Sequence, residues 1–210
     1  MKHLLLILTI LIFHSCNNID KKNDKIQVNE EAMNFNNKGI QLASTFENDS
    51  ILKAIELFDK AIELQPDFLS AYWNKFIFLN QLGKTDDAFK TIKAIEKLRP
   101  DNPDYKLQVG IFTELSGDSI TARKYYIKAE KIYENILDTL TKSNDELSTY
   151  QSTLMSKAIN LKLLGQEREA TNILKNISQN ITNDDYKNMV DNFIVMNRKE
   201  IIKYKTNYKN

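Results

Sequence analysis

Apolar residues recur three and four positions apart along most of this chain, which is the spacing of one face of an α-helix. From about residue 33 to residue 182, stretches with this spacing alternate with short polar breaks. Three of them, FIFLNQL, GIFTELS and AINLKLL, run directly into a glycine, where helices often end in a left-handed cap. Only 5 glycines and 3 prolines interrupt the 210 residues. The pattern therefore predicts an all-α protein made of short helices.

A second regularity is a step of 34 residues between equivalent positions. A fixed period of this length indicates stacked copies of one structural unit. Alanines at such positions would let two helices approach closely, because a larger side chain would push the backbones apart. Prolines at such positions would end a helix, because proline lacks the N–H that a continuing helix needs. The positions that keep the step are Ala54, Ala88 and Ala122; Phe58, Ile92 and Tyr126; Ala61, Ile95 and Ala129; Gly83 and Gly117; and Pro66 and Pro100.

These positions resemble the signature of the tetratricopeptide repeat, and the resemblance covers about residues 33–182. It implies a right-handed solenoid of helical hairpins with about four repeats. Residues 183–210 place apolar side chains along one broad side of a helix. We expect this segment to be a C-terminal capping helix that covers the last repeat.

The first and last repeats depart from the regular step. The pattern returns a final time, 14 residues late, at Gly165, Ala170, Leu174 and Ile177. We place the extra residues in a lengthened second helix of the third repeat, through residues 124–140, and expect residues 143–146 (SNDE) to cap the helix that follows. In the first repeat, Gly39 fits the pattern only if the segment STFENDS carries three extra residues.

The amino-terminal segment has a different character. Lys2 precedes an apolar stretch, residues 4–13, which is well short of the roughly 20 residues that span a bilayer. Such a segment is typical of a secretory signal. With Ser15 followed by Cys16, it resembles a bacterial lipoprotein signal, in which cleavage leaves the cysteine as the first residue and lipid chains are attached to it. The resemblance implies a cleaved signal peptide over residues 1–15 and a lipid anchor at Cys16.

The match to a lipoprotein signal departs from the usual pattern at Phe13 and His14. Residues 16–32 are rich in Asn, Asp and Lys and have no apolar period, so we expect a lipid-anchored flexible tether. Asn17 stands where an aspartate would imply retention in the inner membrane. By the same resemblance, we expect the protein to be anchored in the outer membrane of a Gram-negative bacterium, facing the periplasm.

Charge balance and missing residue types exclude several classes of function. The formal net charge is +1, so the surface lacks the cationic excess that binds nucleic acid. Both histidines, His3 and His14, and the single cysteine lie in or beside the predicted signal. The mature chain would then lack imidazole and a free thiol, which removes the commonest catalytic base, the cysteine nucleophile and most zinc or iron ligands. We expect no enzyme activity, no metal and no cofactor.

In tetratricopeptide proteins, ligands usually lie along the first helices of the repeats, which line an inner groove. The resemblance therefore implies inward sites and groove-edge sites as candidate partner contacts. An aliphatic ladder beside the single tryptophan would suit a partner helix or an extended peptide. The alternative is that these apolar residues pack against neighbouring helices. The inward sites are Asn36, Ile40, Trp73, Ile77, Leu107, Ile111, Met155 and Ile159, and the edge sites are Asn80, Glu114 and Lys162.

These features together predict a membrane-anchored adaptor or scaffold of the bacterial cell envelope that binds an envelope protein or peptide. The alternative is an envelope glycan-binding protein, or a weak glycoside hydrolase, that uses Trp73 and nearby carboxylates. A sugar-binding groove should pair aromatic residues with acids, whereas the predicted groove pairs Trp73 with aliphatic residues. A lipoprotein that inhibits a toxin would carry the same sequence features as an adaptor.

Lipidation of Cys16 is the first testable prediction. Intact-mass analysis of the protein extracted from membranes should show a chain that starts at residue 16 and carries acyl mass, because two or three acyl chains are needed for stable anchoring. The Cys16→Ser variant should carry none. An unmodified Cys16, or a chain that still starts at Met1, would contradict the lipoprotein assignment.

Overall fold

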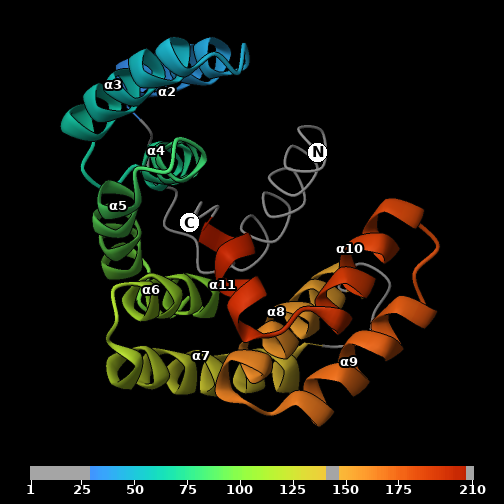
Figure 1. The fold of residues 1–210 in the computed structure, drawn as a ribbon. Coiled ribbons are helices and arrows are strands. Elements are labelled where there is room, and N and C mark those ends of the chain that lie inside the picture. Colours follow the sequence, from blue (N-terminus) through green and yellow to red (C-terminus); the bar gives the residue numbers. More distant parts are fainter. Residues whose placement is uncertain (1–28, 141–146, 207–210) are drawn as a thin grey trace.

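The computed structural model describes residues 29–140 and 147–206, and within these ranges all regular structure is helical. The ten helices follow one another with short connections, and their arrangement is drawn in Figure 1. Their bounds are α2 (Glu30–Ala43), α3 (Asn48–Leu64), α4 (Leu69–Gln81), α5 (Thr85–Leu98), α6 (Pro103–Leu115), α7 (Ser119–Thr139), α8 (Leu147–Leu164), α9 (Glu167–Gln179), α10 (Asp184–Val195) and α11 (Arg198–Thr206).

Consecutive helices pair into four hairpins, α2–α3, α4–α5, α6–α7 and α8–α9, and each hairpin packs against the next. The stack curves, with α4, α6 and α8 on the inner side and α5, α7 and α9 on the outer side (Figure 1). Helix α10 continues the stack by packing against α9. The predicted solenoid of about four helical hairpins is confirmed.

The repeated small residues allow the two helices of a hairpin to approach closely. A Cβ atom placed on Gly39 would lie 2.6 Å from Cε1 of Phe58, and one on Gly110 would lie 2.6 Å from Cε1 of Tyr126. Each glycine therefore leaves the space that an aromatic ring of the second helix fills. The repeated alanines are fully buried, as the period predicted, at Ala54, Ala88, Ala122 and Ala170.

The helix ends follow the turn residues that the sequence marked. Gly83, Gly117 and Gly165 close α4, α6 and α8 with φ angles of 71°, 95° and 85°, a left-handed conformation that side chains other than glycine rarely adopt. Pro103 occupies the first turn of α6, where its missing N–H has no partner to lose.

The lengthened helix predicted for the third repeat is confirmed as α7, which has 21 residues against 14 in α5. Its later part remains packed, because Tyr133 is buried and its hydroxyl donates a hydrogen bond to Asp104 Oδ1 at 2.7 Å. Burial, with the neighbouring Asp104 carboxylate, raises the pKa of Tyr133. The extra turns of α7 therefore extend its contact with α6. The predicted cap at residues 143–146 lies outside the described residues.

Helix α2 begins earlier than predicted, so residues 30–32 belong to the solenoid rather than to the tether. Asn29 is the cause, because its side-chain oxygen accepts hydrogen bonds from the N–H groups of Glu31 and Ala32 at 2.9 and 3.1 Å. Its own N–H donates to Oε1 of Gln65 at 2.9 Å, which ties the start of α2 to the end of α3.

The single helix predicted over residues 183–210 is divided into α10 and α11. Met196 has an extended backbone, and Asn197 starts a new helix through a reciprocal cap with Glu200. Helix α10 covers α9 of the last hairpin, whereas α11 turns back and contacts α6 and α8 (Figure 1). The chain therefore ends its described part on the inner side of the curve.

Enlarging the helix-crossing alanines should destabilise the fold. Ala88→Leu and Ala122→Leu are each expected to lower the free energy of unfolding by about 1–3 kcal/mol, because these sites have no space for a larger side chain. Thermal melts followed by circular dichroism will measure the loss. Lys97→Leu, at an exposed position of α5, is the matched control. If both alanine variants melt within a degree of wild type, the packing register is wrong.

Candidate binding groove

The predicted groove residues of the third and fourth repeats lie beneath α11. Leu107 and Ile111 of α6 and Ile159 of α8 are buried, and they belong to one apolar cluster with Ile201 of α11. Met155 packs at the margin of the same cluster. This half of the inner groove is therefore occupied by the protein's own carboxy-terminal helix.

Glu114, a predicted groove-edge residue, holds the first turn of α11 through Arg198. Its two carboxylate oxygens accept from Nε and Nη2 of Arg198 at 2.7 and 2.8 Å, which is the two-pronged geometry of a strong guanidinium–carboxylate pair. Arg198 also donates through Nη1 to the carbonyl of Leu163. This contact combines charge with fixed geometry, so it selects arginine over lysine.

Tyr126 contacts both members of the Glu114–Arg198 pair. Its hydroxyl donates to Oε2 of Glu114 at 2.7 Å, and the Arg198 guanidinium lies 5.8 Å from the centre of its ring. Burial raises the pKa of Tyr126 well above its usual range, and the Glu114 carboxylate adds to the shift. The phenol therefore stays protonated and remains a donor to Glu114.

Lys162, the edge residue of the fourth repeat, holds the connection between α10 and α11. Its side chain is only 3% exposed, and Nζ donates to the carbonyls of Ile194 and Met196 at 3.0 and 2.7 Å. The Glu167 carboxylate lies 3.2 Å from the same nitrogen. The lysine thus donates hydrogen bonds to carbonyl groups at the end of α10, where a helix leaves its last carbonyls without a partner.

Asn80, the edge residue of the second repeat, reaches the last turn of α11. Its Nδ2 donates to the carbonyl of Lys205 at 3.1 Å. Lys205 itself is half-buried, with Nζ 5.6 Å from the centre of the Phe193 ring, and burial lowers its pKa although Asp104 acts in the opposite direction. Asn80 and Glu114 therefore contact α11 itself, and Lys162 contacts the end of α10 and the connection to α11.

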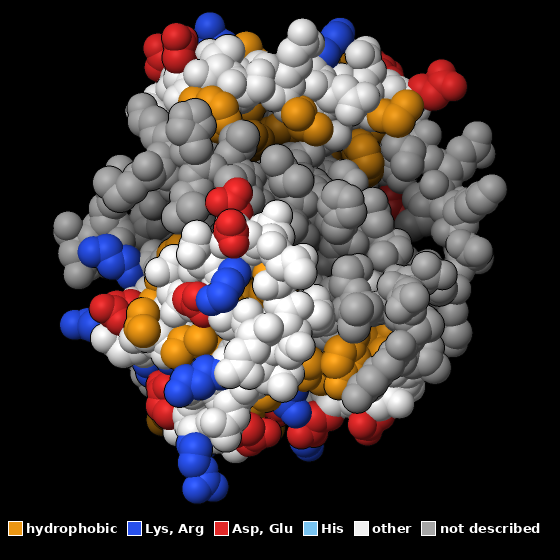
Figure 2. Space-filling model, turned by 90° about the vertical axis from the view of Figure 1, so that its right-hand side faces the viewer, with side chains coloured by type: hydrophobic (Ala, Val, Ile, Leu, Met, Phe, Trp, Pro, Cys, Tyr) orange, Lys and Arg blue, Asp and Glu red, His pale blue; other side chains and the backbone are white. Residues whose placement is uncertain are grey.

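The other end of the groove, along α2 and α4, has exposed apolar side chains. Met33 and Ile40 of α2 are 44% and 43% exposed, and Ile77 of α4 is half-buried. Asn36, between the two α2 residues on the same face, is buried and accepts from Nδ2 of Asn74 at 2.8 Å. In Figure 2, hydrophobic side chains show along the lower margin of the upper part of the molecule, whereas charges of both signs mix over the lower part.

Trp73 is packed rather than displayed. Its side chain is 8% exposed, and its ring lies 5.4 Å from that of Phe76 and 5.6 Å from that of Tyr105 on the next inner helix. Its indole N–H, and the side-chain oxygen of Gln108 on α6, are buried without a hydrogen-bond partner in the described structure. For Trp73 the structure favours the packing alternative left open by the sequence.

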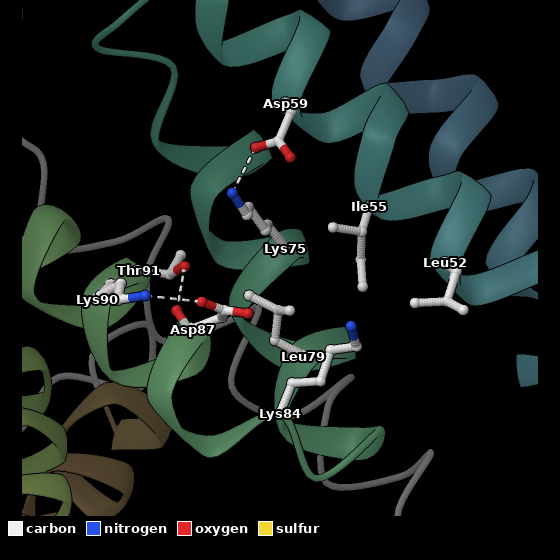
Figure 3. Close-up of a pocket in the computed structure, with 9 residues that line it drawn as sticks. All are labelled: Leu52, Ile55, Asp59, Lys75, Leu79, Lys84, Asp87, Lys90 and Thr91. Atoms are coloured by element: carbon white, nitrogen blue, oxygen red, sulfur yellow. Dashed lines mark hydrogen bonds and ion pairs between the residues drawn. The ribbon is translucent and has the colours of Figure 1, made fainter.

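A separate hollow of about 290 Å³ lies among α3, α4 and α5 (Figure 3). None of the predicted groove residues lines it. Its charged side chains are largely paired with one another, Asp59 with Lys75 and Asp87 with Lys90. We assign no function to this hollow, because both of its carboxylates already pair with lysines.

The remaining predictions concern the lipid anchor, metal binding and membrane-spanning helices. Cys16 lies outside the described residues. Within the described ranges, no three acidic, histidine or cysteine side chains gather in a way that could hold a metal ion. Over the same ranges, no helix combines the length and apolar character needed to cross a membrane.

Sequence reasoning missed Arg198 and Ile201, which make the main contacts of α11 in the groove. A local signal was present, because Asn197 and Glu200 stand three residues apart as a capping box and mark a new helix start. The placement of that helix depends on contacts such as Arg198 with Glu114, which are 84 residues apart in the chain. No periodic pattern reports contacts of that kind.

The Lys162 contacts give a second stability prediction. Lys162→Met should lower the free energy of unfolding by about 1–3 kcal/mol, because two carbonyl groups lose their donor. Backbone amides of α11 should also exchange with solvent faster, and hydrogen-exchange mass spectrometry over residues 194–206 will measure this. Lys199→Met, at an exposed position of α11, is the control. Unchanged exchange in α11 would show that Lys162 does not hold it.

Comparison with known proteins gives a likeness of fold. No protein-family model matches the chain, and no curated protein is similar to it. Among solved structures, the fold is similar to the crystal structure of YrrB, described as a TPR protein with an unusual peptide-binding site. The two share 17% sequence identity over 86% of each chain, with a TM-score of 0.47. The stacked hairpins and the glycine–aromatic contacts described above make this chain a solenoid of helical hairpins over the residues that the structure describes.

Proposed function

We propose that this protein is a non-catalytic interaction adaptor, lipid-anchored in the bacterial cell envelope, that binds a peptide or helix of an envelope protein in its inner groove. The observation that carries the proposal is the way the groove holds α11. An apolar floor takes the aliphatic side chain of Ile201, and polar residues at the groove edge take backbone carbonyls and an arginine. These are the elements of helix-in-groove recognition.

The open end of the groove supports binding to a second protein. Met33 and Ile40 are seven residues apart on α2 and lie on the same face, so they form one exposed apolar stripe. Exposed apolar groups gathered on one face mark interaction surfaces, so this stripe favours a protein partner.

The envelope location rests on the sequence. The short apolar stretch of residues 4–13 and the single cysteine at position 16 support secretion and lipid anchoring, with the solenoid facing the periplasm. The near-neutral charge of the chain supports a protein partner over nucleic acid.

The glycan-binding and glycosidase alternative has little support from the contacts around Trp73. The indole is covered by Phe76 and Tyr105, so it offers no free face to a sugar ring. The nearby acids are also engaged: Glu114 accepts from Arg198 and Tyr126, and Asp104 accepts from Tyr133. A glycosidase needs one carboxyl group to protonate the leaving group and a second to act as base or nucleophile.

The open stripe supplies the test of the adaptor function. A Met33→Asp, Ile40→Asp double variant should lose the proteins that crosslink to the wild type in membranes, because charge at a binding surface opposes desolvation. Partners will be identified by crosslinking, affinity capture and mass spectrometry. The circular dichroism spectrum and melting temperature should stay near those of wild type, because both side chains are exposed.

Ile120→Asp is the matched control, because Ile120 is 76% exposed at the start of α7, away from the inner groove. It should retain every crosslinked protein. Equal capture by the double variant and the control would place partner binding outside the open stripe and would contradict the proposal.

A further inference from the structure

We propose that α11 is a displaceable occupant of the groove and that the partner is a helix of the same chemistry, with an arginine one turn ahead of a branched aliphatic residue. This inference rests on the proposed adaptor function. In α11 the two residues are Arg198 and Ile201, which stand three positions apart and face the groove together. The partner helix would take the place of α11 against α6 and α8.

The specificity of the groove for this pattern comes from two contacts. Ile201 is fully buried in the cluster that contains Leu107, Ile111 and Ile159. Arg198 satisfies both oxygens of Glu114, and no other side chain type presents two parallel N–H groups in that way. The third contact, from Asn80, goes to a backbone carbonyl and so places no demand on sequence.

The construction of α11 favours its release. It has nine residues, and helices of that length are marginal in water unless packing supports them. Only Ile201 and Thr206 are fully covered, whereas Lys199, Glu200 and Lys203 are exposed. The connection to α10 consists of Met196 and Asn197 alone, so α11 can leave without disturbing the hairpins of the solenoid.

Occupancy by α11 also sets the length of the partner. A segment joined by two residues competes at a high effective concentration, so a peptide that merely copies α11 binds the intact protein weakly. A partner that also reaches Met33 and Ile40 makes contacts that α11 lacks. The partner is therefore expected to be longer than α11 and to span the groove from α8 towards α2.

A labelled peptide with the sequence of residues 196–206 (MNRKEIIKYKT) tests displacement directly. Its binding to the full chain in detergent will be measured by fluorescence anisotropy. The Ile201→Asp variant weakens the resident helix, so it should bind the peptide about tenfold or more tightly than wild type does. Lys199→Asp, at an exposed position of α11, should behave as wild type.

A charge exchange tests the arginine requirement. In the Ile201→Asp background, Glu114→Arg should abolish binding of the peptide, and a peptide that carries glutamate in place of its arginine should restore binding. If Ile201→Asp proves unfolded by circular dichroism, Arg198→Ala replaces it, because that side chain lies half-exposed at the groove edge and alanine cannot pair with either residue at position 114.

Equal binding of the peptide by wild type and by the weakened variant would show that α11 is a fixed part of the fold, and would overturn the inference. Failure of the charge exchange to restore binding would overturn the arginine requirement. Either result leaves the adaptor function standing if the open stripe still captures partners. Equal capture of partners by the Met33→Asp, Ile40→Asp variant and by the Ile120→Asp control, with displacement intact, would instead refute the adaptor function alone.

Discussion

The fold and the groove both depend on the close contact between Gly110 and Tyr126. Because the glycine has no side chain, the ring packs directly against α6, and the two helices of the third hairpin lie close together. The same tyrosine then donates to Glu114, which holds Arg198, and its backbone carbonyl accepts from Asn160 on α8 at 3.0 Å. One residue of the repeat signature therefore links the packing of two hairpins to the edge of the groove.

Stacking identical contacts produces a curved molecule in which the inner helices supply the floor of a groove. The inner face must then be covered, because its aliphatic residues cannot remain in water without cost. Here α11 covers the half formed by α6 and α8, and the half formed by α2 and α4 keeps exposed side chains such as Ile40. The protein thus has apolar residues covered by its own helix at α6 and α8, and exposed apolar residues at α2.

The sequence predicted the repeating part of the structure well, because each hairpin makes the same local contacts and the period records them. Ala88, Gly83 and the length of α7 are examples. It failed where a contact is made once. The position of α11 depends on the pair of Glu114 in the third hairpin with Arg198 beyond the last hairpin. For Trp73 the sequence left groove and core open, because the contact with Tyr105 on the next inner helix is not part of the repeated pattern. Contacts within a hairpin recur in every repeat and so leave a period in the sequence, whereas contacts at the end of the solenoid occur once and leave none.

The order of the groove-edge residues favours one orientation of a helix dipole in the groove. The Glu114 carboxylate pairs with Arg198 in the first turn of α11, the end of a helix that carries partial positive charge. The Asn80 amide donates to a carbonyl of the last turn, the end that carries partial negative charge. A helix laid the opposite way would bring its terminal carbonyls against a carboxylate. The groove therefore distinguishes the two ends of a helix by the partial charges of its backbone, independently of the side chains that the helix carries.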